Sequence, residues 1–384
     1  MIKNKALKII TIVGTRPEII RLSRVMARLD EYVNQIIVHT GQNYDYELNE
    51  VFFNDLNIRK PDYFLNVDTS SLGATAGDII RKTEEVLKKE NPDALLVLGD
   101  TNSSLSAYIA RRMHITIFHM EAGNRCFDFN VPEEINRRII DHISDYNLVY
   151  TEHARRHLIA EGLPQRRIYL TGSPLNEVLR FYEDKINNST ILDKLKLDRN
   201  RYFVVSTHRE ENVDNPENLA KILAALNLIA SEYNYPVIVS THPRTMKRLK
   251  ENFNSDKLNS LINFLKPFGF FDYVALQKNA ACVISDSGTI SEESAMLSFP
   301  AISLRNSMER PEAQDAGTVI LSGLDSDIIL SSVETVIDEH SKGSYKEIPA
   351  DYKIENTSWR VVKLILGNTR LSNKWDAIYK PLTL

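Results

Sequence analysis

Short apolar runs alternate with longer amphipathic segments along most of the chain. Strand-like runs occupy residues 7–13, 36–40, 94–98, 116–120, 147–151 and 168–170, and each is followed by a polar turn and a helical pattern. Pro17 suits the first turn of a helix running to Leu29, where a missing backbone N–H costs nothing. This alternation of strands and helices predicts a parallel, doubly wound sheet.

The alternation is interrupted at residues 181–201, which are charged, and then resumes. Further strand-like runs occupy residues 202–206, 237–240, 262–265, 282–285, 301–304 and 319–322. We therefore predict an α/β fold with two doubly wound Rossmann-like domains, residues 1–173 and 174–365, facing a central cleft. The C-terminal segment, about residues 366–384, is expected to pack back on the first domain.

Composition is that of a soluble globular protein, with 43% hydrophobic and 26% charged residues among 384. The formal net charge of −4 gives no general attraction to nucleic acid or membranes, so neither is an expected partner. The two cysteines, Cys126 and Cys282, are far apart and favour a reducing, cytoplasmic location. The apolar run 9–13 ends at Gly14, which is too short for a signal peptide or a membrane span.

Polar residues follow the predicted strands of the first domain, where α/β proteins place their ligands. Arg16 lies in a strand-to-helix turn that presents backbone N–H groups to an anion, unless it is an ordinary turn with a surface arginine. Asp100 follows the third strand, either as a helix cap or as a site carboxylate. Glu121 follows the fourth strand. Together these carboxylates suggest an acid/base site.

Residues 132–144 have the pattern of a helix, with isoleucines on one face. Glu133, Arg137 and Asp141 recur every four residues, so they share a different face. One interpretation is a solvated row of ion pairs; the other is that Glu133 and Arg137 point into the cleft. The spacing alone leaves both open.

In the second domain, His208 and Arg209 follow the first strand as a diphosphate contact or proton donor. His242 and Arg244 repeat this pattern, although a histidine in such a turn is more often structural. Neither histidine has the spacing of a metal site, so we expect no metal. There is also no G-x-G-x-x-G and no P-loop among the 14 glycines, which disfavours classical nucleotide sites.

The segment after the fourth strand of this domain is the best nucleotide candidate. Backbone N–H groups at Ser287, Gly288 and Thr289 can hold a diphosphate at a helix start. Thr289 and Glu292 have the spacing of a capping box, which explains part of the pattern. Glu293 can accept the hydroxyls of a ribose. Arg310 adds a cation to the same edge.

The order of these motifs resembles the non-hydrolysing UDP-N-acetylglucosamine 2-epimerase family, and its capsule and O-antigen branch in particular. The motifs are GTRPE, GDT, H-x-E-A-G-x-R, PEE-x-NR, HREEN, DSG-x-I-x-EE and ERPE-x-x-x-AGT, from about residue 8 to about residue 323. The resemblance implies a glycosyltransferase-B type fold, a UDP-sugar between the domains, no metal or nicotinamide cofactor, and a homodimer. It implies inversion at C2 by elimination of UDP and its re-addition.

The resemblance also carries roles to matching positions of this chain. The implied catalytic residues are Asp100, Glu121, Glu133, Arg137 and His208. The implied substrate-binding residues are Arg16, Arg21, Arg209, Phe271, Ser287, Gly288, Thr289, Glu293 and Arg310.

Departures from the family pattern bear on the substrate. Arg21 stands where a lysine is usual, and Gly123-Asn124-Arg125 replaces Gly-Leu-Arg. These departures favour the UDP-linked 6-deoxy-L-talose derivative as the substrate, which would give UDP-N-acetyl-L-fucosamine. UDP-N-acetylglucosamine and a UDP-diacetamido-uronate remain alternatives; Arg21 would suit the carboxylate of the latter. Gln42 is followed by Asn43, so a second glutamine of the family's regulatory site is missing.

Three other activities are alternatives to epimerisation. A glycosyltransferase of the same fold would leave C2 unchanged, and three carboxylates exceed what transfer requires. A silent nucleotide-sugar sensor would not need them. A hydrolysing epimerase would admit water, which sequence does not reveal.

Overall fold

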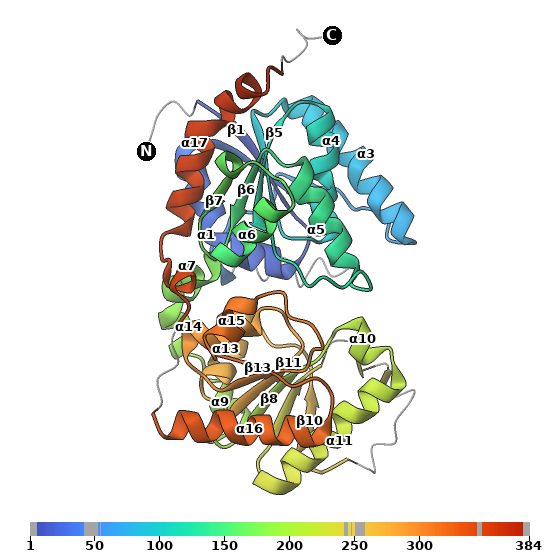
Figure 1. The fold of residues 1–384 in the computed structure, drawn as a ribbon, viewed down its shortest axis with the longest axis vertical. Coiled ribbons are helices and arrows are strands. Elements are labelled where there is room, and N and C mark those ends of the chain that lie inside the picture. The colour runs from blue at the N-terminus through green and yellow to red at the C-terminus, as the bar shows by residue number, and fades with distance from the viewer. Residues whose placement is uncertain are drawn as a thin grey trace. The chain divides into compact units, whose positions relative to one another are not determined.

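The apolar runs form the strands of two parallel sheets, one in each of two structural units (Figure 1). Unit 1 comprises residues 1–180 and 351–384, and unit 2 comprises residues 181–350. The computed structural model describes residues 6–41, 53, 55–241, 245–246, 248–249, 258–343 and 348–378. The predicted α/β class with two doubly wound units is confirmed.

Unit 1 contains a seven-stranded sheet with the order β3-β2-β1-β4-β5-β6-β7. Its strands are β1 (Lys8–Val13), β2 (Asn34–His39), β3 (Tyr63–Phe64), β4 (Ala94–Leu98), β5 (Thr116–Ala122), β6 (Tyr146–Val149) and β7 (Ile168–Leu170). β3 was not predicted, because two residues are too few to show a period. It pairs with β2 through Val38 opposite Tyr63 and His39 opposite Phe64.

Helices cover both faces of this sheet (Figure 1). They are α1 (Arg16–Tyr32), α3 (Leu72–Glu90), α4 (Ser106–Arg112), α5 (Pro132–Ile143), α6 (Glu152–Ala160), α7 (Pro174–Phe181) and α17 (Thr357–Trp375). Ile117 of β5 packs into the core formed with α3, α4 and α5. Its neighbour Thr116 points the other way and donates a hydrogen bond to Thr369 of α17 at 3.2 Å, as alternation along a strand requires.

Unit 2 repeats the design with six strands in the order β10-β9-β8-β11-β12-β13. They are β8 (Phe203–Ser206), β9 (Val237–Ser240), β10 (Ile262–Leu265), β11 (Cys282–Ser285), β12 (Ala301–Ser303) and β13 (Ile320–Leu321). Its helices are α8 (Glu183–Asn187), α9 (Ile191–Leu195), α10 (Glu210–Val213), α11 (Pro216–Tyr233), α13 (Phe270–Lys278), α14 (Ile290–Leu297), α15 (Pro311–Asp315) and α16 (Ser326–Ser341). The apolar faces of α11 and α16 pack on one face of the sheet.

The chain returns to unit 1 earlier than expected, at Asp351 rather than near residue 366, and unit 1 ends at Arg180 rather than at residue 173. Local packing gives the reason. Asn176 of α7 donates hydrogen bonds to the carbonyl oxygens of Tyr352 and Ile354, at 3.0 and 3.2 Å. Ile354 lies so close to Gly172 that a Cβ there would be 2.6 Å away. Residues 351–356 therefore belong with α7 in unit 1.

We expect His39 to make unit 1 less stable in mild acid. Its ring is buried, stacks on Phe64 at 4.7 Å, and accepts a hydrogen bond from the Gly41 N–H. Burial lowers the pKa of His39 from 6.5 to about 4. Its contribution to the free energy of unfolding is therefore full above pH 6.5 and is lost as pH falls toward about 4, at up to about 1.4 kcal/mol per pH unit.

Urea unfolding followed by tryptophan fluorescence measures this effect in unit 1, because Trp359 and Trp375, the two tryptophans of the sequence, both lie on α17. In a His39→Gln variant the loss of stability between pH 7 and pH 5 should be smaller than in the wild-type protein. Equal losses in the two proteins would contradict the assignment.

Candidate functional site

The predicted residues of unit 1 gather where the neighbouring strands β1, β4 and β5 end. The buried carboxylate of Glu18 joins two of the turns at this edge. It accepts hydrogen bonds from the backbone N–H of Thr15 at 3.0 Å and from the hydroxyls of Ser103, at 2.6 Å, and Thr101. Burial raises the pKa of Glu18, against the lowering effect of these donors. The turn carrying Arg16 and the turn carrying Asp100 are thereby fixed to each other.

Glu121 ends β5 in an unusual backbone conformation. Its φ is 64°, and the pairing of β5 with β6 shifts register between Met120 and Ala122. A left-handed conformation costs a non-glycine residue about 1–2 kcal/mol, and such strain often accompanies function. The Glu121 carboxylate forms an ion pair with Arg21, and both are largely buried. It also lies beside Gly99, where an added Cβ would be 4.0 Å from its carboxyl carbon.

Asp100 forms an ion pair with the buried guanidinium of Arg137 on α5. The Asn136 amide donates a 3.0 Å hydrogen bond to the Asp100 carbonyl oxygen, which fixes α5 to the same turn. Glu133 is half-buried in the first turn of α5. Within the described part of the chain, no hydrogen bond or ion pair joins it to Asp100 or Glu121.

Of the two interpretations of α5, the solvated row of ion pairs is wrong. Arg137 and Asp141 are 2% and 0% exposed, whereas Ile135 and Ile139 are 48% and 42% exposed. The polar face of this helix therefore packs inward, because its charges find partners on neighbouring elements. Arg137 pairs with Asp100 after β4, and Asp141 pairs with Arg125 after β5. Within α5 itself, the Glu134 carboxylate lies 3.3 Å from Arg137 Nη1.

A buried chain of charges behind β5 was not predicted. The Asp141 carboxylate lies 2.9 Å from His119 Nδ1 and accepts a 2.7 Å hydrogen bond from Arg125. Burial opposes ionisation of Asp141, but His119 and Arg125 hold its pKa below the usual range. Arg125 also binds Glu161 and lowers its pKa to about 2. The other ring nitrogen of His119 lies 2.9 Å from the Gly99 carbonyl oxygen. This row of buried charges therefore supports the turn at Asp100.

In unit 2, the corresponding edge is organised by a carboxylate that was also missed, Asp286. It follows β11, is fully buried, and accepts hydrogen bonds from the backbone N–H groups of His208 and Arg209 at 3.1 Å and from Asn212 at 3.0 Å. Despite burial, the His208 and Asn212 side chains and the Arg209 N–H lower the pKa of Asp286. The His208 ring, 3.2 Å from this carboxylate, remains 47% exposed in its side chain.

The turn before α14 differs in two ways from the prediction. The backbone N–H of Ser287 donates to the Ser285 hydroxyl, and that of Thr289 donates to the Ser287 hydroxyl. Of the three N–H groups predicted to hold a diphosphate, only that of Gly288 has no hydrogen bond within the described residues. The capping box is also wrong. The Thr289 hydroxyl donates to the side chain of Glu293 at 2.8 Å, while Glu292 is buried. Glu292 lies 3.6 Å from Arg310, which draws it away from the helix start.

Arg310 reaches this turn from the segment after β12, and its guanidinium donates a 2.9 Å hydrogen bond to the Gly288 carbonyl oxygen. A Cβ on Gly288 would lie 2.7 Å from Arg310 Nη1, so a larger residue there would require the Arg310 guanidinium to shift. Glu293 is held by Thr289 and by Gln277, which donates at 2.6 Å.

Other predicted residues lie apart from these contacts or outside the described residues. The Phe271 ring packs against Tyr182, with centroids 5.3 Å apart, and Arg16 is half-buried. The segments carrying His242 and Arg244 and the glutamine at position 42 lie outside the described residues.

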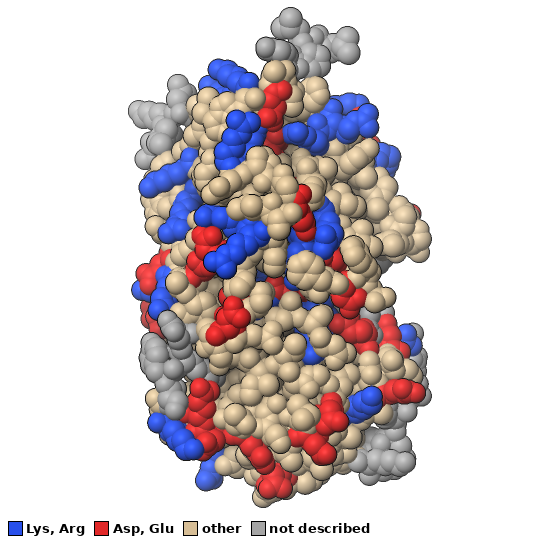
Figure 2. Space-filling view, in the orientation of Figure 1, with Lys and Arg blue, Asp and Glu red and all other residues tan. Residues whose placement is uncertain are grey.

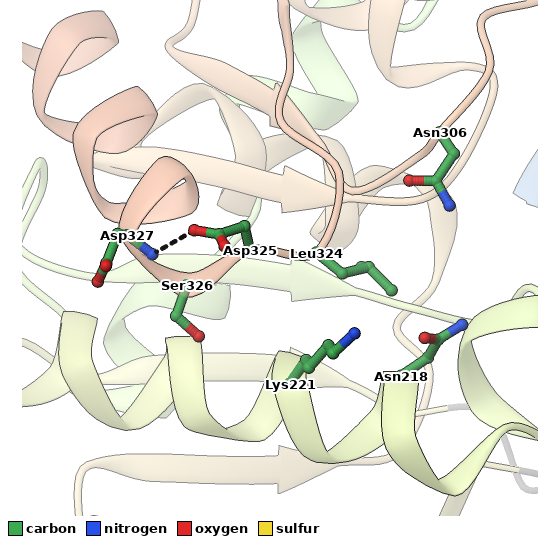
Figure 3. Close-up of a pocket in the computed structure, with 7 residues that line it drawn as sticks. All are labelled: Asn218, Lys221, Asn306, Leu324, Asp325, Ser326 and Asp327. Atoms are coloured by element: carbon green, nitrogen blue, oxygen red, sulfur yellow. Dashed lines mark hydrogen bonds between the residues drawn. The ribbon is translucent and has the colours of Figure 1, made fainter.

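A pocket of about 420 Å³ in unit 2 is lined by none of the predicted residues (Figure 3). It is lined by Asn218, Lys221, Asn306, Leu324, Asp325, Ser326 and Asp327.

Among the described residues, no three His, Cys, Asp or Glu side chains are grouped as metal ligands, and no helix is long and apolar enough to cross a membrane. On the face shown in Figure 2, Lys and Arg side chains gather over unit 1, and Asp and Glu side chains over unit 2.

Comparison with known proteins places the chain in a family. A model of the UDP-N-acetylglucosamine 2-epimerase family matches residues 27–366. The chain therefore belongs to this family and is an isomerase of the UDP-sugar 2-epimerase class, with the two-unit fold of glycosyltransferase-B type.

Three similar proteins illustrate the relationship. The structure of UDP-N-acetylglucosamine 2-epimerase from Rickettsia bellii is 49% identical, with a TM-score of 0.89 over 96% of this chain and 98% of that one. The Methanocaldococcus jannaschii UDP-GlcNAc 2-epimerase, in complex with UDP-GlcNAc and UDP, is 35% identical, with a TM-score of 0.87 over 94% and 99%. The UDP-2,3-diacetamido-2,3-dideoxy-D-glucuronate 2-epimerase of Pseudomonas aeruginosa is 33% identical over 86% of this chain and 92% of its own.

We expect Asp286→Asn to lower the free energy of unfolding of unit 2 by about 2–4 kcal/mol, because an amide has a single, uncharged acceptor oxygen and its NH2 group would face buried donors. Hydrogen exchange of the β8 and β11 amides measures the change. Asp325→Asn is the matched control: Asp325 caps α16 at an exposed position, where asparagine serves as well, so the change should stay within about 0.5 kcal/mol. Equal effects of the two substitutions would contradict the role of Asp286.

Proposed function

We propose that the protein inverts C2 of a UDP-2-acetamido sugar by eliminating UDP and adding it back. The observation that carries the proposal is the placement of Asp100 and Glu121 at the ends of the neighbouring strands β4 and β5, each in an ion pair with an arginine. Membership of the epimerase family supports it. Carboxylates fixed in this way suit proton transfer, because their position is set before the substrate arrives.

The order of bond changes follows from the acidity of the sugar. No carbonyl activates the C2–H bond, so direct removal of the proton is difficult. Breaking the bond from C1 to the UDP oxygen first leaves an oxocarbenium-like centre, which acidifies C2–H. UDP departs as an anion with the electron pair of the C1–O bond. A carboxylate then takes the C2 proton, and the electron pair of the C2–H bond forms the C1=C2 bond of a glycal. Protonation of C2 on the other face and return of the UDP oxygen to C1 give the epimer, with no net oxidation or reduction.

In this proposal Asp100, Glu121 and Glu133 exchange the proton. Arg21 and Arg137 fix two of these carboxylates through ion pairs.

The groups at the edge of unit 2 are proposed to hold the nucleotide. His208, Arg209 and Arg310 supply donors or cations for the departing diphosphate, and charge-assisted contacts of this kind stabilise a developing anion. The Ser287–Thr289 turn contributes through Gly288, the residue of the three with an N–H not used within the turn. Glu293, held by two side chains, accepts from the ribose hydroxyls. Arg16 is proposed as a further diphosphate contact, and Phe271 as a neighbour of the uracil.

The identity of the sugar is the finer part of the proposal. The Rickettsia bellii and Methanocaldococcus jannaschii relatives carry the name UDP-N-acetylglucosamine 2-epimerase, which makes UDP-GlcNAc the first substrate to test. UDP-N-acetyl-L-fucosamine formation, for capsule or O-antigen synthesis, stays a prediction from the sequence departures. The diacetamido-uronate is supported by the Pseudomonas aeruginosa relative, whereas Arg21, the cation suggested by the sequence for its carboxylate, is buried in the ion pair with Glu121. A cytoplasmic homodimer also stays a prediction.

Carboxylate variants test the acid/base roles. Asp100→Asn, Glu121→Gln and Glu133→Gln should each lower kcat about 10²–10⁴-fold, the usual contribution of general acid–base catalysis. UDP affinity should stay within about threefold, because the diphosphate groups are untouched. Initial rates and calorimetric titration with UDP measure the two quantities.

Two further variants complete the comparison. Glu85→Gln is the control, since Glu85 is exposed on α3, and its kcat should equal that of the wild-type protein. Glu293→Ala should show the opposite pattern, with UDP affinity lowered more than kcat. Full turnover in all three carboxylate variants would overturn the assignment.

Proton NMR in D2O tests the reaction and selects the substrate. UDP-GlcNAc, UDP-N-acetyl-L-fucosamine and UDP-2,3-diacetamido-glucuronate are each incubated separately with the enzyme. Deuterium at C2 of one sugar, with growth of its 2-epimer, is the expected result, because C2 is reprotonated from solvent-exchanged carboxyl groups. No exchange in any of them, from protein that binds UDP, would contradict epimerisation of these sugars and favour transfer or another sugar.

A further inference from the structure

The carboxylate of Glu309 joins three arginines at the carboxyl edge of the unit 2 sheet. Its Oε1 accepts hydrogen bonds from Arg209 at 3.1 Å and from Arg305 at 2.9 Å, and its Oε2 lies 3.8 Å from Arg310. Glu309, Arg305 and Arg310 are all at most 5% exposed. Two of these arginines are among the proposed diphosphate groups; Arg305 was not predicted.

Arg305 is the least exposed member of this cluster, with 1% of its side chain accessible. Besides its contact with Glu309, its Nε and Nη1 have no hydrogen-bond partner among the residues that the structure describes. A buried donor left without a partner costs about 1–3 kcal/mol. This cost is not explained by packing alone, so it points to a role in the site.

The position of Arg305 indicates what that role is. Its Nη1 would lie 3.6 Å from a Cβ on Gly288, and Arg310 contacts the same glycine. Arg305 is one of three arginines that contact Glu309 or Glu292 here, and its guanidinium offsets part of the negative charge of these two carboxylates.

We propose that Arg305 and Glu309 are a positioning pair beneath the diphosphate site. Glu309 holds Arg209 and Arg310 apart at fixed positions, and Arg305 compensates its charge so that both remain attractive to an anion. Buried charges act strongly at this range, because little water screens them. The inference rests on the proposed function, and neither residue of the pair is required to touch the substrate.

The test compares UDP with uridine, which lacks the diphosphate. Arg305→Gln should weaken UDP binding about tenfold, which is the scale of one charge-assisted interaction, and change uridine binding by no more than about twofold. Arg305→Lys keeps the charge and should retain most of the UDP affinity, which also covers the case in which Arg305→Gln does not fold. Adding Glu309→Gln to Arg305→Gln should recover part of the lost affinity, because the uncompensated carboxylate is removed.

Arg167→Lys is the matched control, since Arg167 is another buried arginine paired with a carboxylate, Asp376 of unit 1. It should leave binding of both ligands unchanged. If the ratio of UDP to uridine affinity is the same in the wild-type protein, Arg305→Gln and Arg305→Lys, the positioning pair is refuted while the proposed function stands. Wild-type protein that does not bind UDP would instead refute the proposed function.

Discussion

The pairing of buried charges at the carboxyl edges of the two sheets is the constraint on which both parts of the candidate site depend. A carboxylate or guanidinium removed from water is costly unless a partner of opposite charge or several hydrogen bonds compensate it. Asp141 meets this condition between His119 and Arg125, and Asp286 meets it with two backbone N–H groups and Asn212. The turns that carry the candidate residues are attached to these buried groups.

The two units meet the constraint in different ways, and the difference suits their proposed roles. In unit 1, Arg21 and Arg137 each hold a carboxylate from another element in place, those of Glu121 and Asp100. In unit 2, carboxylates such as Glu309 hold arginines at the edge of the sheet. Positioned carboxylates suit proton transfer, and positioned cations suit binding of a diphosphate. Because the partners are already arranged, little reorganisation is needed when a substrate binds.

The predicted capping box and one of the two interpretations left open for α5 are wrong for the same reason. Thr289 and Glu292 have the spacing of a capping box, and Glu133, Arg137 and Asp141 have the spacing of a solvated row. Both patterns describe interactions within one helix, each worth at most about 1–2 kcal/mol. In the structure, Glu292 and Arg137 have ionic partners on other elements, which are stronger when buried. Tertiary pairing therefore overrides the local pattern at these positions.

The sequence by itself determined the fold class, the family and the strands other than β3, because hydrophobic period and motif order can be read directly along the chain. The runs 94–98, 237–240 and 282–285 coincide with β4, β9 and β11. Only the tertiary structure decided which charges meet and where unit 1 resumes. Arg21 and Glu121 are 100 positions apart, and Asn176 binds a segment near residue 352. Such contacts arise when strands distant in sequence become neighbours in a sheet, and no local spacing records them.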